Sequence, residues 1–212
     1  MMTRFRLLGL LLCALIANAV SAQQLTIQIT QGVDNPIPIA IVPFGWEGFG
    51  ELPENITGVV NSDLRNSGEF SPIAEQNMLS TPHAEADVYF RDWRFLGADY
   101  LLIGKINRST DSALVQVQYE LFDVRGEKRM IGEVISGTEA QLRDISHQIS
   151  DVVFEQVTGV RGAFATKILY VTSQRISQTV TNYQLNLADA DGGRPQVLLE
   201  SQEPIMSPTW SP

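Results

Sequence analysis

The stretch that decides the fold runs from Ala113 to Gly159 and reads ALVQVQYELFDVRGEKRMIGEVISGTEAQLRDISHQISDVVFEQVTG. In its first part, apolar and polar side chains mostly alternate, which is typical of a β-strand with one face against a core. The turn residues Arg125-Gly126-Glu127 follow. They predict a hairpin in which Met130–Ile135 returns as the antiparallel partner.

The second half of this stretch changes to helical spacing. Thr138 followed by Gln141 is a capping-box pair, and an apolar stripe then runs from Leu142 to Val157. Gly159 offers a left-handed stop. We therefore expect an amphipathic helix that packs on the sheet formed by the hairpin.

Upstream of this stretch, Pro53–Ser67 predicts a second amphipathic helix that ends before Gly68. Ile37–Phe44 predicts a strand that its prolines confine to an edge or to a short pairing. The remaining expectations are a Gly-rich turn at 45–50, a surface loop at 71–86, one or two helical turns at 90–96 and a buried strand at 100–106. Residues 34–160 then form an α/β domain with a mixed sheet and two main helices, long enough to bury a core.

After Gly159 the helical spacing stops. Three short strands are expected at Lys167–Thr172, Asn182–Ala188 and Gln196–Leu199, which is typical of a sandwich, a barrel or a propeller. The chain ends with SPTWSP at 207–212. A propeller blade takes about 40 to 45 residues, so residues 161–212 correspond to about one incomplete blade.

The amino end has the features of a cleaved signal peptide over residues 1–22. Arg4 and Arg6 precede an uncharged stretch that is too short to cross a bilayer, and small side chains lead up to Ala22. We expect cleavage between Ala22 and Gln23, with Ala19 as the second choice. Cys13 is the only cysteine and lies inside this leader, so we expect a mature chain without disulfides or thiolate metal sites. Leu12 stands before it where a lipoprotein signal has a small residue, so we expect no lipid anchor either.

Charge narrows the class of partner. Removing residues 1–22 takes away two of the 15 basic residues and none of the 24 acidic residues, which lowers the net charge from −9 to −11. Phosphate contacts need Lys or Arg, so this balance argues against nucleic acid and anionic lipid. Protein partners, or partners associated with peptidoglycan, remain, and direct membrane insertion is not expected.

A second alternating segment follows the leader and is a candidate binding strand. Its residues are Gln23, Gln24, Leu25, Thr26, Ile27, Gln28, Ile29, Thr30, Gln31 and Gly32. The apolar side chains fall on one face, so the segment could pair within its own domain or add to the sheet edge of a partner. Both uses are open, and they do not exclude each other.

Four further motifs, together with the tail, resemble the TolB family in the right order. They are IVPFGW at 41–46, SDLRNSGEF at 62–70, VFEQVTGVRGAF at 153–164, and YQL at 183–185 with DADG at 189–192. The tail SPTWSP alone is shared by several propeller families, but the ordered set is specific and spans the mature chain.

The resemblance implies an α/β domain joined to a six-bladed β-propeller in the periplasm. In that family the propeller docks the lipoprotein Pal, and the first mature residues bind TolA, so Gln23–Gly32 become the expected TolA-binding residues. In that family, the Tol-Pal system formed with these partners supports outer-membrane invagination at cell division and outer-membrane integrity. Some colicins exploit it. We assign no Pal-docking residues in this sequence, because in the family most of them lie in other blades of the propeller.

Enzyme chemistry finds little support in the sequence. We find no G-x-S-x-G, P-loop or G-x-G-x-x-G motif, and expect no catalytic residues, cofactor or metal. His83 is expected in a polar loop and His147 on an exposed helix face near Asp144 and Asp151. Asp189-Ala190-Asp191-Gly192 lacks the rest of a calcium loop and predicts a tight turn.

The main competing hypothesis is the propeller of an exported serine peptidase of the α/β-hydrolase type. Such propellers share the tail motif, but the α/β domain followed directly by a blade is the TolB order. A two-lobed solute-binding protein is a weaker alternative, since propeller blades do not form such a cleft.

Overall fold

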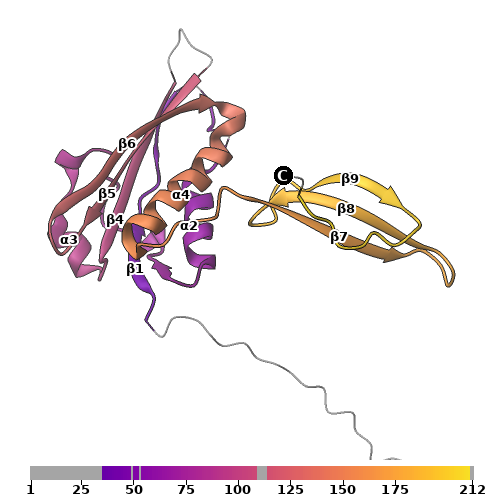
Figure 1. The fold of residues 1–212 in the computed structure, drawn as a ribbon. Helices are drawn as coiled ribbons and strands as arrows, with labels where there is room; N and C mark the ends of the chain where they lie inside the picture. The colour runs from indigo at the N-terminus through magenta and orange to yellow at the C-terminus, as the bar shows by residue number, and fades with distance from the viewer. Residues whose placement is uncertain (1–34, 49, 53, 109–113, 211–212) are drawn as a thin grey trace, which may run out of the picture. The chain divides into compact units, whose positions relative to one another are not determined.

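The computed structural model describes residues 35–48, 50–52, 54–108 and 114–210 (Figure 1). Within these ranges a mixed α/β part is followed by a three-stranded antiparallel sheet, which confirms the expected fold class. The predicted leader at 1–22 and the alternating segment at 23–33 lie outside the described residues. Among the helices of the described ranges, none has the length and apolarity needed to span a membrane.

The first sheet is mixed, with the strand order β3-β1-β4-β5-β6 and with β2 also paired to β4. Its strands are β1 (Ile37–Ile41), β2 (Gly45–Glu47), β3 (Phe70–Pro72), β4 (Tyr100–Arg108), β5 (Leu114–Asp123) and β6 (Lys128–Thr138). The strands β1, β2 and β3 pair in parallel, whereas β4, β5 and β6 are antiparallel, as the hairpin prediction required.

Strand β1 lies in the interior of the sheet, so the edge position suggested by its prolines is wrong. It pairs with β3 on one side and with β4 on the other, over three residues each. The proline at 38 precedes the pairing with β4, which begins at Ile39, and its carbonyl accepts a hydrogen bond from the amide of Asp99 at 2.9 Å. The short pairing was predicted correctly.

The expected Gly-rich turn at 45–50 also needs correction, because its first three residues form β2 beside β4. Between β1 and β2 the chain bends around Phe44. A Cβ at Gly104 of β4 would lie 2.5 Å from the Phe44 ring. Glycine at 104 therefore lets the aromatic ring lie directly on the strand.

The helices are α2 (Ile56–Asn66), α3 (Phe90–Phe95) and α4 (Leu142–Thr158), with short 3-10 turns at Glu75–Asn77, Glu85–Asp87 and Glu139–Gln141. Helix α2 starts later than predicted because the Asn55 side chain accepts a hydrogen bond from the Gly58 amide at 2.9 Å and caps it there. The capping box of Thr138 and Gln141 is present, and Gly159 ends α4 at φ +75°.

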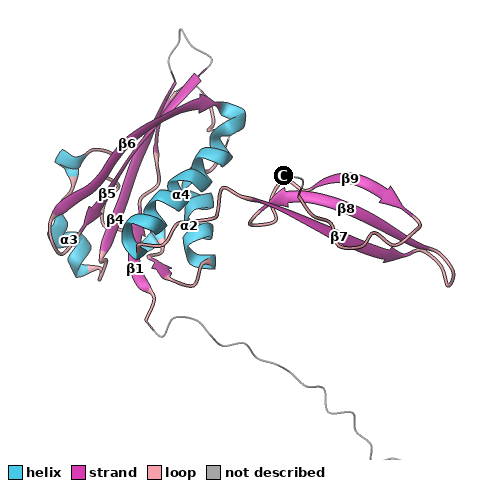
Figure 2. Cartoon of the chain, viewed as in Figure 1, coloured by secondary structure: helices cyan, strands magenta, loops and turns pink. Residues whose placement is uncertain are grey.

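Helices cover both faces of the first sheet (Figure 2). The core shared by α2, α4 and the sheet contains Ile56, Val60, Leu64, Leu102, Val117, Tyr119, Ile145, Ile149 and Val153. A smaller core under α3 contains Ala40, Val42, Trp93, Leu101, Ile103 and Phe122. This layering holds α2 and α4 side by side on one face, which positions the site described below.

The second sheet has the order β7-β8-β9, with β7 at Lys167–Arg175, β8 at Thr181–Asp189 and β9 at Gln196–Ser201. These strands confirm the three that the sequence predicted. Within this sheet only Asn186, Ala188 and Asp189, all in β8, are fully buried. It is a thin sheet whose apolar faces are largely exposed.

Candidate functional site

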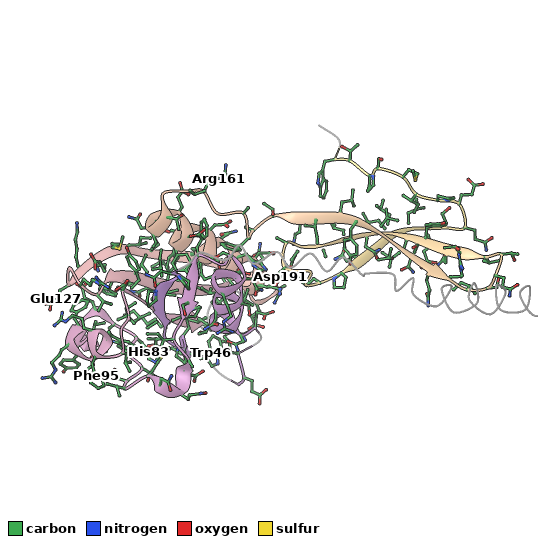
Figure 3. The ribbon with its side chains drawn as sticks, turned by 90° about the horizontal axis from the view of Figure 1, so that it is seen from below. Trp46, His83, Phe95, Glu127, Arg161 and Asp191 are labelled. Atoms are coloured by element: carbon green, nitrogen blue, oxygen red, sulfur yellow. The ribbon has the colours of Figure 1, made fainter. Side chains whose placement is uncertain are left out.

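Nine charged or ionisable side chains from the two helices and the second sheet meet in one cluster, which we call the junction cluster. Its members are Glu54, Asp63, Arg143, Asp144, His147, Lys167, Asp189, Asp191 and Arg194. Asp191, labelled in Figure 3, lies in the turn between β8 and β9 and pairs with Arg143 of α4. The cluster thus joins the α/β part to the following sheet.

Asp63 of α2 is the inner anchor of this cluster. It is 2% exposed, and its Oδ2 lies 2.8 Å from His147 Nδ1 and accepts a hydrogen bond from the Ser150 hydroxyl at 2.7 Å. His147 and Ser150 lie one turn apart on α4, because residues three and four positions apart share a helix face. The buried carboxylate therefore ties α2 to α4.

Asp189, at the end of β8, is the outer anchor. Its carboxylate is 1% exposed and pairs with three cations, Arg143 at 3.2 Å, Arg194 at 2.7 Å and Lys167. Arg143 belongs to α4, whereas Lys167 belongs to β7. One buried carboxylate therefore joins the helix to two strands of the second sheet.

Hydrogen bonds within the turn between β8 and β9 hold its charged side chains in place. Asp191 accepts a hydrogen bond from the Gly193 amide at 2.8 Å, and the Asp189 carbonyl accepts one from the Gly192 amide at 2.9 Å. Gly192 has a φ of +82°, which side chains other than glycine adopt at a cost. Arg194 reaches back to pair with Asp144 on α4.

Ion pairs in the junction cluster favour the ionised forms of Asp189, Asp144 and Arg194. Burial opposes ionisation of Asp189, but hydrogen bonds from Arg194 and Lys167 outweigh it and hold the pKa of this carboxyl well below its ordinary value. The hydrogen bond from Arg194 likewise lowers the pKa of Asp144. These partners raise the pKa of Arg194 in return.

Opposing effects act on the pKa of His147. Burial disfavours its charged form, but the hydrogen bond and the charge of Asp63 outweigh burial, and Asp191 adds to their effect. The pKa of His147 is therefore raised above its ordinary value, although Arg143 acts against this.

Neither nucleophilic catalysis nor metal binding fits this geometry. The Ser150 hydroxyl donates to Asp63 rather than to His147, so these two side chains do not form the hydrogen-bonded Ser–His pair that activates a serine nucleophile. Ligand atoms of Asp63, His147 and Asp191 lie within 4.8 Å of one another, but Asp191 is already paired with Arg143. The adjoining cavity has about 110 Å³, smaller than a typical ligand site.

The structure corrects one expectation and confirms another. His147 is 2% exposed, so its assignment to an exposed helix face is wrong. The stretch 189–192 forms the tight turn that was predicted. His83 is half-buried beside Gly45, and Ala22 and Gln23–Gly32 lie outside the described residues.

Sequence reasoning missed Asp63, Arg143 and Arg194 as members of a site. No local pattern marks them, because the contacts join residues 84 and 46 positions apart, as in Asp63 with His147 and Arg143 with Asp189. The one available signal was His147 itself, a polar residue four positions after Arg143 on a helix with an apolar stripe.

Comparison with known proteins identifies the family. Residues 25–130 match the TolB amino-terminal domain, and residues 154–212 match the TolB beta propeller domain. The chain is 46% identical over 205 residues to the Tol-Pal system protein TolB of Pseudomonas syringae pv. syringae, covering 96% of this chain and 47% of that protein. The same protein of Pseudomonas aeruginosa is also 46% identical over 205 residues, with 97% and 47% covered.

A solved structure agrees with these matches. The crystal structure of TolB from Acinetobacter baumannii superposes with a TM-score of 0.72 at 30% identity, covering 86% of this chain and 43% of that one. The chain spans about half the length of the curated relatives that it matches. The succession of an α/β domain and a propeller sheet, and these matches along nearly the whole chain, show that the chain belongs to the TolB family of Tol-Pal system proteins.

Proposed function

We propose that this Tol-Pal system protein is an exported periplasmic adaptor without catalytic activity, which binds TolA through Gln23–Gly32 and Pal through its propeller. In this role it supports outer-membrane invagination at cell division and outer-membrane integrity. The observation that carries the proposal is the match of residues 25–130 and 154–212 to the two TolB domains in order.

The alternating pattern of Gln23–Gly32 supports the TolA arm of the proposal. In an extended conformation, Leu25, Ile27 and Ile29 fall on one face, and each contributes roughly 2 kcal/mol when it is buried. An extended segment also offers its backbone amides and carbonyls to a sheet edge. Residues 23–33 are therefore assigned as the TolA-binding segment, after a leader at 1–22.

The peptidase alternative is disfavoured by the same comparisons. Its tail motif fits a propeller, but the amino-terminal half of the chain matches the TolB amino-terminal domain. We propose bounds of 34–160 for the α/β domain and 161–212 for the start of the propeller.

The TolA arm is tested by a matched pair of substitutions, Ile27→Asp and Gln28→Asp, in the full-length protein. Both add one negative charge, but only the first falls on the apolar face. We expect Ile27→Asp to weaken TolA binding roughly 30-fold, the equivalent of one buried aliphatic side chain, and Gln28→Asp to leave it nearly unchanged. Equal affinities of the two variants in a calorimetric titration would contradict the strand-addition mechanism.

The Pal arm is tested by co-purification of the full-length protein from cell envelopes. We expect Pal to accompany both the wild-type protein and Ile27→Asp, since the propeller is intact in each. Recovery without Pal from both preparations would contradict the adaptor role even if TolA binding were present.

A further inference from the structure

One nitrogen of His147 has no hydrogen-bond partner among the described residues although it is buried. Nδ1 faces Asp63 at 2.8 Å, whereas Nε2 is unpartnered and lies 3.8 Å from Oδ2 of Asp189. In the neutral ring with a proton on Nδ1, the lone pair of Nε2 faces a carboxylate. In the protonated ring, an N–H faces that same carboxylate.

The groups around the His147 ring carry a net negative charge, which favours protonation of the ring. Asp63 faces the ring from α2, with Glu54 just before that helix, and Arg143 and Asp144 lie on the same helix as His147. Lys167, Asp189, Asp191 and Arg194 face it from the second sheet. Five carboxylates thus meet three permanent cations, and a protonated imidazole reduces the negative excess from two charges to one.

We propose that His147 is a proton-operated latch between the α/β domain and the first propeller sheet. The protonated ring bridges Asp63 of α2 and Asp189 of β8 and holds the β8–β9 turn against α4. Loss of the proton leaves a lone pair facing Asp189 and loosens the turn, so the two parts are coupled more tightly at lower pH.

The sign of the effect follows from the neighbours of the ring. Asp63 and Asp191 raise the pKa of His147 in the closed arrangement. A raised pKa means that the proton stabilises the closed form fully below the ordinary value of 6.5, and that this stabilisation is lost as pH rises through the higher value. Coupling should therefore weaken as pH rises above the ordinary value of the imidazole.

The groups that hold the latch are not those of the proposed TolA-binding segment. Arg143, Arg194 and Lys167 keep Asp189 ionised throughout this pH range, so His147 is the group whose charge changes. The latch is therefore independent of the proposed adaptor function, and failure of either leaves the other standing.

Hydrogen exchange of the turn at 189–194 tests the latch in the full chain. We compare protection at about pH 6, below the ordinary value of 6.5, with protection along a series of higher pH values, after correction for intrinsic exchange. We expect protection to fall roughly fivefold or more along this series, the lower end of typical coupling between linked sites. In His147→Gln, whose amide can still donate to Asp63 but cannot titrate, the pH dependence should disappear.

The other histidine of the chain provides the matched control. His83→Gln removes the imidazole beside Gly45 and should retain the full pH dependence of the wild type. The titration of His147 followed by NMR in the wild type covers the case in which His147→Gln fails to fold, because its midpoint must coincide with the midpoint of the loss of protection. Constant protection across the pH range, separate midpoints, or protection that depends on added Zn²⁺ instead would overturn the latch.

Discussion

Asp189 shows how a single carboxylate is made stable away from water. It is almost fully buried, yet Arg143, Arg194 and Lys167 all contact it. Burying an ion is costly, and these contacts offset the cost only while all of them are made. A substitution that removes the charge of Asp189 but keeps its shape should therefore lower the stability of the fold.

Asp189→Asn should lower the free energy of unfolding by roughly 2 to 3 kcal/mol, less than for a fully buried pair because Lys167 and Arg194 remain partly in water. Urea unfolding of the two proteins measures the difference. Asp87→Asn is the control, since this exposed carboxylate lies in a short 3-10 turn, and we expect a change within about 0.5 kcal/mol. Similar losses in both variants would show that the junction cluster adds little.

The same carboxylate predicts a dependence on acid. Its pKa is lowered on folding, so its contribution is present above the ordinary value of 3.8 and is lost as pH falls from there through the lower folded value. Below the ordinary value of His147, 6.5, the difference in urea midpoint between the wild type and Asp189→Asn should be constant down to about 3.8 and then shrink. A difference that disappears already near pH 6 would assign the effect to another group.

At the scale of elements, the end of α4 depends on Gly159. Its φ of +75° lies in the left-handed region, where a side chain with a Cβ is strained. Gly159→Ala should therefore destabilise the chain by about 1 kcal/mol, measured by thermal or urea unfolding. Gly132→Ala on β6 is the control, because a Cβ there meets nothing closer than 3.5 Å and the backbone is not left-handed.

Elements with a strong local signal could be predicted from the sequence. Helix α4 has a capping box at Thr138, a stripe of apolar residues and a terminal glycine, and the structure confirms each. Strand β3 was missed inside a predicted loop because Phe70–Pro72 is too short for a pattern, and it exists only through its pairing with β1. The interior position of β1 likewise depends on partners that are distant in the sequence.

The junction cluster was not predictable for the same physical reason. His147 with Asp144 and Asp151 nearby is typical of a solvated helix face, and only the packing of α2 against α4 brings Asp63 to the ring. Asp189 in the DADG stretch likewise predicts only a tight turn. The buried ion pairs form between elements, where sequence spacing gives no information.

At the scale of the whole chain, the two parts differ in how much apolar surface they bury. The α/β part has two cores, whereas Val197, Leu198 and Leu199 of β9 are each about half exposed. In propellers, stability comes largely from contacts between neighbouring blades. The second sheet should therefore depend more on its surroundings than the α/β part does.

This difference predicts the outcome of limited proteolysis on the 212-residue chain. A stable fragment that covers about residues 35–160 should survive, because cleavage needs local opening and the α/β part can open only by disrupting a core. Strands β7 to β9 should be cleaved first, and Asp189→Asn should speed their loss by weakening the contacts of β8 with α4 and β7. Cleavage of both parts at one rate would contradict independent stability, and equal rates in the wild type and Asp189→Asn would remove the role of the buried carboxylate in holding the second sheet.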